Sequence, residues 1–236
     1  MDVRTLGTIL GVWAHPDDEA YLSAGLMAMA TRAGSRVVCV TATRGELGST
    51  DIDRWPLDTL AEVRTVEMAA SLDILGVTEH HWLDYPDGAC AHIPEGNAIG
   101  RLAELISSVQ PDTVVTFGPD GMTGHLDHQT VSDWTTKAFV QAADPGARLY
   151  YATKTAEFDD RFTPVPAHRM AFGEGPPRTP EVETDLAFRL SDEILDLKVG
   201  ALQAQVSQVT FLYEEMGADL YRDWVGDEWF CLAATA

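Results

Sequence analysis

The stretch "GTILGVWAHPDDEAYLSAG", residues 7–25, joins an apolar run to one histidine and three consecutive acidic residues. The run at 7–14 is short and rich in large apolar residues, which is typical of a buried strand. The residues that follow, from about 19 to 33, have helix-forming composition and end before a glycine. We therefore expect a strand–helix unit with the polar segment "HPDDE", residues 15–19, at its junction.

Strand and helix signals keep alternating up to about residue 150. Further strands are predicted at 35–43, 80–88, 112–117 and 147–153, and helices at 57–76, 97–110 and 127–142. Regular alternation of this kind is typical of α/β proteins, in which helices cover a parallel sheet. The sequence predicts a Rossmann-like, mostly parallel sheet with helices on both faces.

The second half of the chain is less regular. Residues 157–183 include "TPVPAH" and "GEGPPRTP", and this proline content predicts an ordered excursion or flap rather than a hinge between domains. The segment 191–208 is predicted as the final helix. With 236 residues, 45% of them hydrophobic, we expect a single domain over 1–236.

A second polar cluster, "GHLDH" at 124–128, follows the predicted strand 112–117 within a glycine-rich loop. In Rossmann-like sheets the first strand and this later strand are neighbours at the topological switch point, where ligands bind. The two clusters would then converge on one crevice.

Each cluster has a plain structural reading as well as a chemical one. The three acids suit a helix N-terminus, but that reading leaves His15 unexplained. His15 and Asp18 are three residues apart, so in a helical first turn they would face one point, with Asp17 facing elsewhere. His125 and His128 have the same spacing. Imidazole and carboxylate together suit Zn²⁺, and three protein ligands would leave an open position, as catalytic sites require.

The segments "AHPDDE" (14–19) and "GHLDH" (124–128) resemble the two signatures of the PIG-L/LmbE-type zinc-dependent N-deacetylases. The resemblance extends through "TATRGELG", "EVRTVEMAASLDILG", "LDYPDG" and "KVGALQAQVSQ", and so covers most of the chain. It implies that His15, Asp18 and His128 bind zinc, or another divalent ion. It also implies that Asp17 is the general base.

The resemblance implies roles for five more residues. His125 would stabilise the oxyanion and protonate the leaving amine, and Asp127 would orient that neighbouring imidazole and raise its pKa. Arg64, Asp87 and Glu46 match positions on the substrate side of the family's site.

Two positions depart from the family pattern. Gln205 stands where the family's tail usually has a histidine, and Thr123 stands where some members have a tyrosine. Neither matches a metal ligand, so these departures concern substrate identity.

The leading hypothesis is a hydrolase that removes an acetyl group from an N-acetylated amino sugar or glycoconjugate. An amidase of the same mechanism, acting on another acyl amide such as a thiol conjugate or an antibiotic intermediate, is the alternative. A non-catalytic, metal-dependent sugar-binding protein ranks last, because Asp17 is present.

Composition limits the classes of molecule that this protein is expected to bind. The net charge of −21 would repel nucleic acid and anionic membranes, and no apolar stretch approaches the roughly 18 residues of a spanning helix. A small-molecule substrate is expected, and a homo-oligomer stays open. Three widely spaced cysteines and the absence of a signal-peptide pattern favour the cytoplasm. Trp224 and Trp229 are expected in the core, with stacking on a sugar ring as the alternative.

Overall fold

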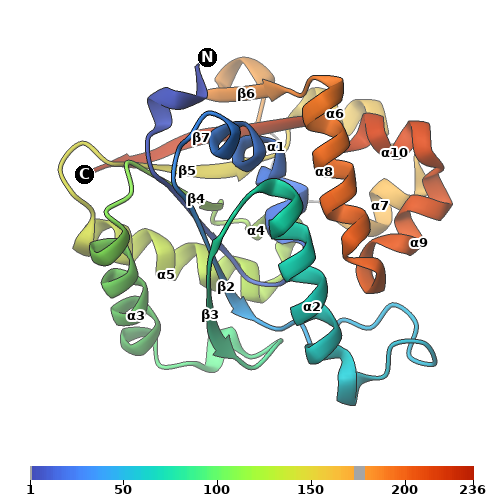
Figure 1. The fold of residues 1–236 in the computed structure, drawn as a ribbon, viewed down its shortest axis with the longest axis horizontal. Helices are drawn as coiled ribbons and strands as arrows, with labels where there is room; N and C mark the ends of the chain where they lie inside the picture. The colour runs from blue at the N-terminus through green and yellow to red at the C-terminus, as the bar shows by residue number, and fades with distance from the viewer. Residues whose placement is uncertain (1, 173–178) are drawn as a thin grey trace.

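The protein is built around one seven-stranded sheet, seen in a computed structural model that describes residues 2–172 and 179–236 (Figure 1). The strands are β1 (Ile9–Trp13), β2 (Val37–Thr43), β3 (Glu79–Tyr85), β4 (Thr113–Phe117), β5 (Arg148–Thr153), β6 (Leu186–Arg189) and β7 (Asp227–Thr235). Their order is β3-β2-β1-β4-β5-β7-β6, and only β7 runs antiparallel to its two neighbours. The predicted α/β fold with a mostly parallel sheet is confirmed.

The two strands that precede the polar clusters are neighbours. Ile9 of β1 pairs with Thr113 of β4 on one side and with Val37 of β2 on the other, all in parallel. All three of these strands are buried along their whole length, which explains their nearly unbroken apolar sequences. The carboxyl ends of β1 and β4 therefore open at the same edge, where the chain order reverses.

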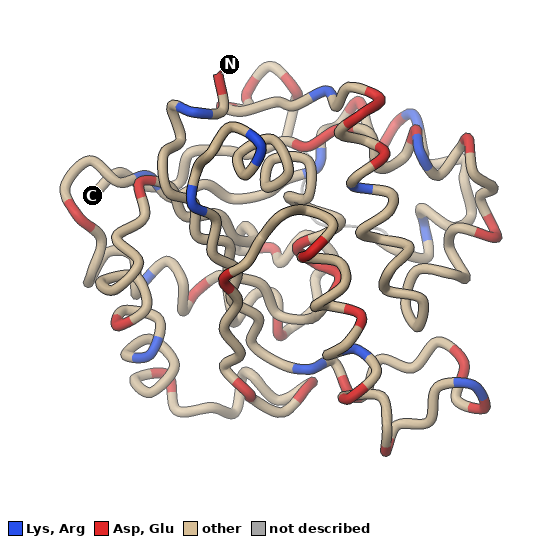
Figure 2. Tube along the Cα trace, viewed as in Figure 1, with Lys and Arg blue, Asp and Glu red and all other residues tan. Residues whose placement is uncertain are grey.

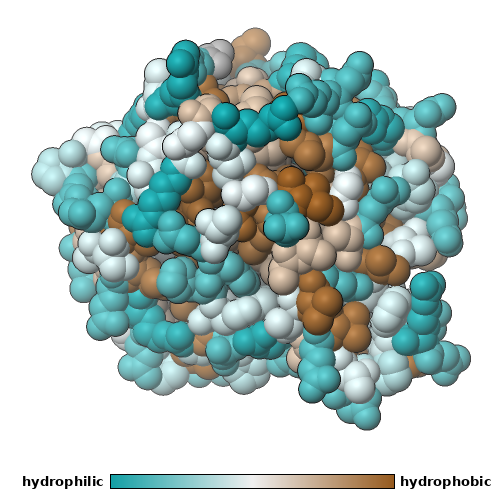
Figure 3. Space-filling model, viewed as in Figure 1, coloured by the Kyte–Doolittle hydropathy of each residue, from teal (hydrophilic) through white to brown (hydrophobic). Residues whose placement is uncertain are grey.

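Helices cover both faces of the sheet. The long ones are α1 (Asp18–Arg32), α2 (Leu57–Leu75), α3 (Glu95–Val109), α5 (Leu126–Ala142), α8 (Asp192–Ala204) and α9 (Val206–Met216). Helices α1, α2 and α8 pack against one another on one side, and α3 packs against α5 on the other (Figure 1). On the face in Figure 3 hydrophilic side chains predominate, with apolar atoms showing mainly towards the middle.

Short helices fill the remaining connections. They are η1 (Val3–Leu6), η2 (Cys90–His92), α4 (Gly121–Gly124), α6 (Ala156–Phe162), α7 (Pro166–Phe172), η3 (Glu181–Glu183) and α10 (Ala218–Trp224). Helices α6 and α7 lie within the proline-rich stretch, of which residues 173–178 fall outside the described residues. Together with α9 and α10 they gather at the end of the molecule beyond α8 (Figure 1).

The prediction of one final helix at 191–208 is wrong. The helix breaks at Gln205, whose backbone leaves the helical region (φ −94°, ψ 58°), and α9, α10 and β7 follow. The buried Gln205 side chain donates a hydrogen bond to the Glu19 carboxylate, a tertiary contact that local sequence does not reveal. Strand β6 escaped prediction because it is four residues long. Among the described residues, no helix is both long and apolar enough to cross a membrane.

Candidate metal centre and active site

The segment between β1 and α1 is a tight loop whose backbone is held by side chains. Asp17 has φ 100°, a conformation that is costly for any residue with a side chain. The His15 N–H donates to Asp18 Oδ2 at 2.8 Å, and the Asp17 N–H donates to Glu19 Oε2 at 3.0 Å. Arg64 donates to the Pro16 carbonyl. His15 therefore lies in the loop, and the expected helical first turn at this residue is wrong.

The second cluster begins α5. His125 is the N-cap residue, and its Nδ1 accepts the Asp127 N–H at 3.1 Å. Because Nδ1 is the acceptor, the ring proton of a neutral His125 lies on Nε2. His128 follows in the first turn, where its ring stacks on Phe117 of β4 with centroids 4.2 Å apart.

Three side chains from the two clusters bring their ligand atoms close together. His15 Nδ1 is 3.1 Å from His128 Nε2 and 3.6 Å from Asp18 Oδ2, and Asp18 Oδ1 is 3.4 Å from His128 Nε2. Zinc bonds of 2.0–2.2 Å in a tetrahedron place ligand atoms about 3.3 Å apart. All three side chains are buried. The donor set and its spacing therefore fit a divalent metal ion.

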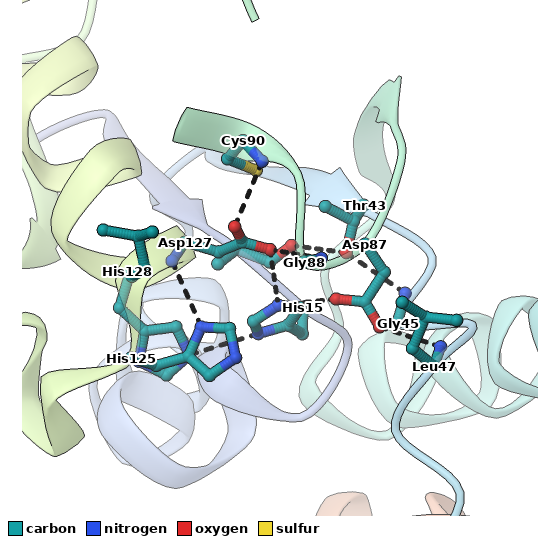
Figure 4. Close-up of polar contacts among 12 residues, drawn as sticks. His15, Thr43, Gly45, Leu47, Asp87, Gly88, Cys90, His125, Asp127 and His128 are labelled. Carbon is teal, nitrogen blue, oxygen red and sulfur yellow. Dashed lines mark hydrogen bonds and ion pairs between the residues drawn. The ribbon is translucent and has the colours of Figure 1, made fainter. Parts of the chain in front are cut away.

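The second nitrogen of each of these imidazoles faces an acceptor, and Figure 4 shows the two carboxylates beside His15. His15 Nε2 is 3.1 Å from Asp87 Oδ1 and 3.3 Å from Asp127 Oδ2, and His128 Nδ1 is 2.9 Å from the Gly121 carbonyl. Acceptors at this position fix the tautomer and orient the other nitrogen towards a metal. The Asp127 carboxylate thus faces His15, whereas only its backbone N–H reaches His125, so the expectation that the carboxylate orients His125 was wrong.

Two other groups of ligand atoms share His15: one with His125 and His128, and one with Asp87 and Asp127. The second group is already occupied by hydrogen bonds, since Asp87 Oδ2 accepts the Leu47 N–H at 2.9 Å and Asp127 accepts two backbone N–H groups. Asp87 Oδ1 and Asp127 Oδ2 also face His15 Nε2, so these two carboxylates orient the His15 ring and are not themselves the expected metal ligands.

Asp17 faces the cavity, contrary to the expectation that it would face elsewhere. Its Oδ2 is 3.4 Å from an Arg64 nitrogen. Burial raises the pKa of Asp17 to about 7, against the lowering effect of Arg64. Burial also opposes the charged form of Asp18, but His128 and His15 hold its pKa below the usual value. The two adjacent acids therefore differ in chemistry, as a base and a ligand must.

Four further residues have defined places. Arg64 lines the cavity and also donates to the Gly45 carbonyl at 2.9 Å, so it braces two loops. Glu46 was expected on the substrate side, but it does not line the cavity. Its carboxylate accepts the Asp87 N–H at 2.9 Å. Thr123 Oγ1 is 3.3 Å from His128 Nδ1. Gln205 is fully buried behind Glu19 and does not line the cavity.

A cavity of about 330 Å³ opens at this site. One wall carries most of the predicted residues: His15, Asp17, Asp18, Arg64, Asp87, His125 and His128. A second wall contains the aromatic side chains Tyr21, Phe158, Phe172, Trp224 and Trp229. For Trp224 and Trp229 stacking on a sugar ring was the alternative to the expected core role. No local pattern in the sequence pointed to Tyr21, Phe158 or Phe172 as lining residues.

The sequence profile of PIG-L, described as GlcNAc-PI de-N-acetylase, matches residues 10–139. This match contains both polar clusters. The chain belongs to the PIG-L family. A relative from Kineococcus radiotolerans, named 1D-myo-inositol 2-acetamido-2-deoxy-alpha-D-glucopyranoside deacetylase, is 33% identical over 86% of this chain and 69% of its own length.

Solved structures extend the likeness to the whole fold of this PIG-L protein. The N,N'-diacetylchitobiose deacetylase from Pyrococcus horikoshii has a TM-score of 0.69 at 18% identity and covers 98% of this chain and 85% of its own. GalB, a 4-carboxy-2-hydroxymuconate hydratase from Pseudomonas putida, has a TM-score of 0.64 at 18% identity over 89% of this chain and 82% of its own. The fold therefore supports more than one reaction, and the site must decide between them.

Proposed function

We propose that this PIG-L protein is a zinc-dependent N-deacetylase that hydrolyses the acetamide of an N-acetylated amino sugar or glycoconjugate. The observation that carries the proposal is the arrangement around Asp18. One nitrogen from each of His15 and His128 and the two Asp18 carboxylate oxygens lie 3.1–3.6 Å from one another between side chains, and a further carboxylate, Asp17, lines the same cavity. Relatives named as deacetylases of acetamido sugars support the substrate class.

His15, Asp18 and His128 would hold the ion. When bound, zinc polarises the amide carbonyl and makes a nearby water more acidic. The same ligands tolerate other divalent ions, so the identity of the metal is part of the proposal.

Asp17 takes a proton from the attacking water. Its carboxylate is aimed into the cavity, and Arg64 at 3.4 Å keeps an unprotonated form accessible near neutral pH. A base whose pKa lies close to the working pH is the most effective. Water then adds to the carbonyl carbon, the C–N bond breaks, and the proton goes to the departing amine.

His125 is the donor on the other side of the carbonyl. Its Nδ1 is occupied by the Asp127 N–H, which leaves Nε2–H for the developing oxyanion. Its ring centroid lies 4.9 Å from that of His15 and 5.0 Å from that of His128, so it borders the proposed metal position. The leaving amine receives the proton that Asp17 takes from the water, because a second proton on His125 Nδ1 would displace the Asp127 N–H.

Acetate release from N-acetylglucosamine derivatives by the zinc-loaded protein tests the proposal. His128→Ala should lose both the metal and turnover. His92→Ala is the matched control, because that histidine lies in the η2 segment and does not line the cavity. Full turnover by the metal-free His128→Ala protein would contradict the proposal.

The proposal includes a small-molecule amino-sugar or acyl-amide substrate and a cytoplasmic location. Acidic residues are spread along the whole trace (Figure 2), and the net charge is −21. Cys39, Cys90 and Cys231 are free thiols, the first two of them buried, as a reducing compartment permits.

A further inference from the structure

The cavity at the site has two chemically different walls. One wall carries the three imidazoles with Asp17, Asp18 and Asp87, all within the part of the chain that matches the PIG-L profile. The second wall carries five aromatic side chains, four of them on α6, α7, α10 and β7, beyond residue 139, and one, Tyr21, on α1. Apart from Tyr21, the catalytic residues and these aromatic side chains are therefore supplied by separate parts of the sequence.

The aromatic rings of the second wall form a connected row, which we call the aromatic wall. Its members are Tyr21, Trp224, Phe172, Phe158 and Trp229. Successive ring centroids are 5.9, 6.0, 6.2 and 5.5 Å apart. Aromatic pairs favour such offset and edge-to-face contacts at 4.5–7 Å, so the rings support one another. Trp224 and Trp229 thus line the cavity as well as packing, beyond the core role expected for them.

The polar ends of two of these rings are engaged by the protein. Trp224 Nε1 donates to His168 Nδ1 at 3.1 Å, and the Tyr21 hydroxyl accepts from Tyr221 at 3.2 Å. Phenylalanine has no polar end to offer. The rings of the aromatic wall therefore present mainly apolar surface to the cavity, whose lining also contains polar side chains such as Lys154 and Asp227.

From this wall we infer that the substrate carries an apolar alkyl or aryl group, which packs against the aromatic wall while the amide lies at the metal ligands. This inference rests on the proposed hydrolysis and names its substrate class more closely. An alkyl or aryl group placed on these rings removes apolar surface from water, which favours its binding there. The apolar group can belong to the acyl side or to the aglycone of the amino sugar, and both would meet the same wall.

Binding of reaction products tests this inference without turnover. Titration calorimetry compares phenyl with methyl glucosaminide for the aglycone side, and hexanoate with acetate for the acyl side. In at least one pair the apolar member should bind about tenfold tighter or more. Which pair shows the preference identifies the side. Affinities equal within about twofold in both pairs would overturn the inference.

Substitutions in the aromatic wall provide a second test of the binding preference. Phe158→Ala should remove most of the preference, and Phe172→Leu should reduce it while keeping a side chain in place. Phe211→Ala is the matched control, because Phe211 is 48% exposed on α9 and does not line the cavity. An unchanged preference in folded Phe158→Ala and Phe172→Leu proteins would also overturn the inference.

Failure of this inference and failure of the proposed function are distinguishable. Acetate release without any apolar preference contradicts only the role of the aromatic wall. A clear binding preference in a zinc-loaded protein that hydrolyses no amide contradicts only the proposed reaction.

Discussion

The Glu19 carboxylate accepts the backbone N–H of Asp17 at 3.0 Å and so stabilises the left-handed backbone of that residue, at φ 100°. Gln205 Nε2 donates to the other oxygen of Glu19 at 2.7 Å, and the Ser71 hydroxyl donates to it at 3.3 Å. The third acid of "HPDDE" therefore holds the first one in place. Burial, with the charges of Asp17 and Asp18, raises the pKa of Glu19 to about 8.

Glu19→Ala should lower kcat by about tenfold or more, with KM nearly unchanged, because a lost buried hydrogen bond of ~1–3 kcal/mol frees the Asp17 backbone. Glu19→Gln should recover part of the rate, since its amide oxygen can still accept the Asp17 N–H. Steady-state kinetics measures both variants against Glu62→Ala, an exposed position on α2. An unchanged kcat in Glu19→Ala would show that Asp17 needs no such support.

Asp127→Asn should weaken metal binding about 10- to 100-fold, although Asp127 is not a proposed ligand. The reason is that its carboxylate faces His15 Nε2 at 3.3 Å and orients the ring that presents Nδ1. Competition with a zinc chelator measures the affinity. Asp133→Asn on the exposed side of α5 is the control. Equal zinc affinities for the Asp127→Asn and wild-type proteins would argue against this role.

Lys198→Met should lower the free energy of unfolding by about 3–5 kcal/mol, because it leaves the Glu228 carboxylate buried without its charge partner. Lys198 Nζ and Glu228 Oε1 are 2.7 Å apart and both side chains are fully buried. The exposed Arg32–Glu193 pair also involves α8 and joins it to α1. Arg32→Met should cost about 1 kcal/mol or less. Urea unfolding compares the two variants, and similar losses would contradict the argument.

His80→Gln should make stability less sensitive to acid. Burial lowers the pKa of His80 to about 4 from an unfolded value of 6.5, so the unfolded chain binds the extra proton between these pH values. The wild type should therefore lose stability as pH falls from 6.5 to 4, and the variant should lose less. Urea midpoints at pH 7 and pH 5 measure the difference. An equal shift of the urea midpoint between pH 7 and pH 5 in both proteins would contradict this prediction.

Much of the fold and of the metal cluster was predictable because the signals are local. The strands β1 and β4 are buried apolar runs, and each is followed at once by its polar cluster, so the topology brings "HPDDE" and "GHLDH" together. The family resemblance added the roles of individual residues, such as Asp18 as a metal ligand and Asp17 as the general base. The pairing of Asp127 with His15 was not predictable, because it depends on side-chain direction across two loops.

The C-terminal third was harder to predict for a physical reason. The break at Gln205 is stabilised by a buried contact with Glu19, which is 186 residues away in the sequence. The aromatic wall is assembled from α1, α6, α7, α10 and β7, and only tertiary packing places these rings on one cavity. Composition showed the aromatic residues without showing which of them face a ligand.

The central claim is that Asp17 acts as the base of a metal-dependent deacetylation. The most direct measurement is acetate release by zinc-loaded wild-type and Asp17→Asn proteins, with zinc content determined in the same samples and Asp53→Asn as an exposed control. The account predicts that Asp17→Asn keeps its zinc and loses about 10²- to 10⁴-fold in kcat. Wild-type turnover by a zinc-loaded Asp17→Asn protein would contradict it.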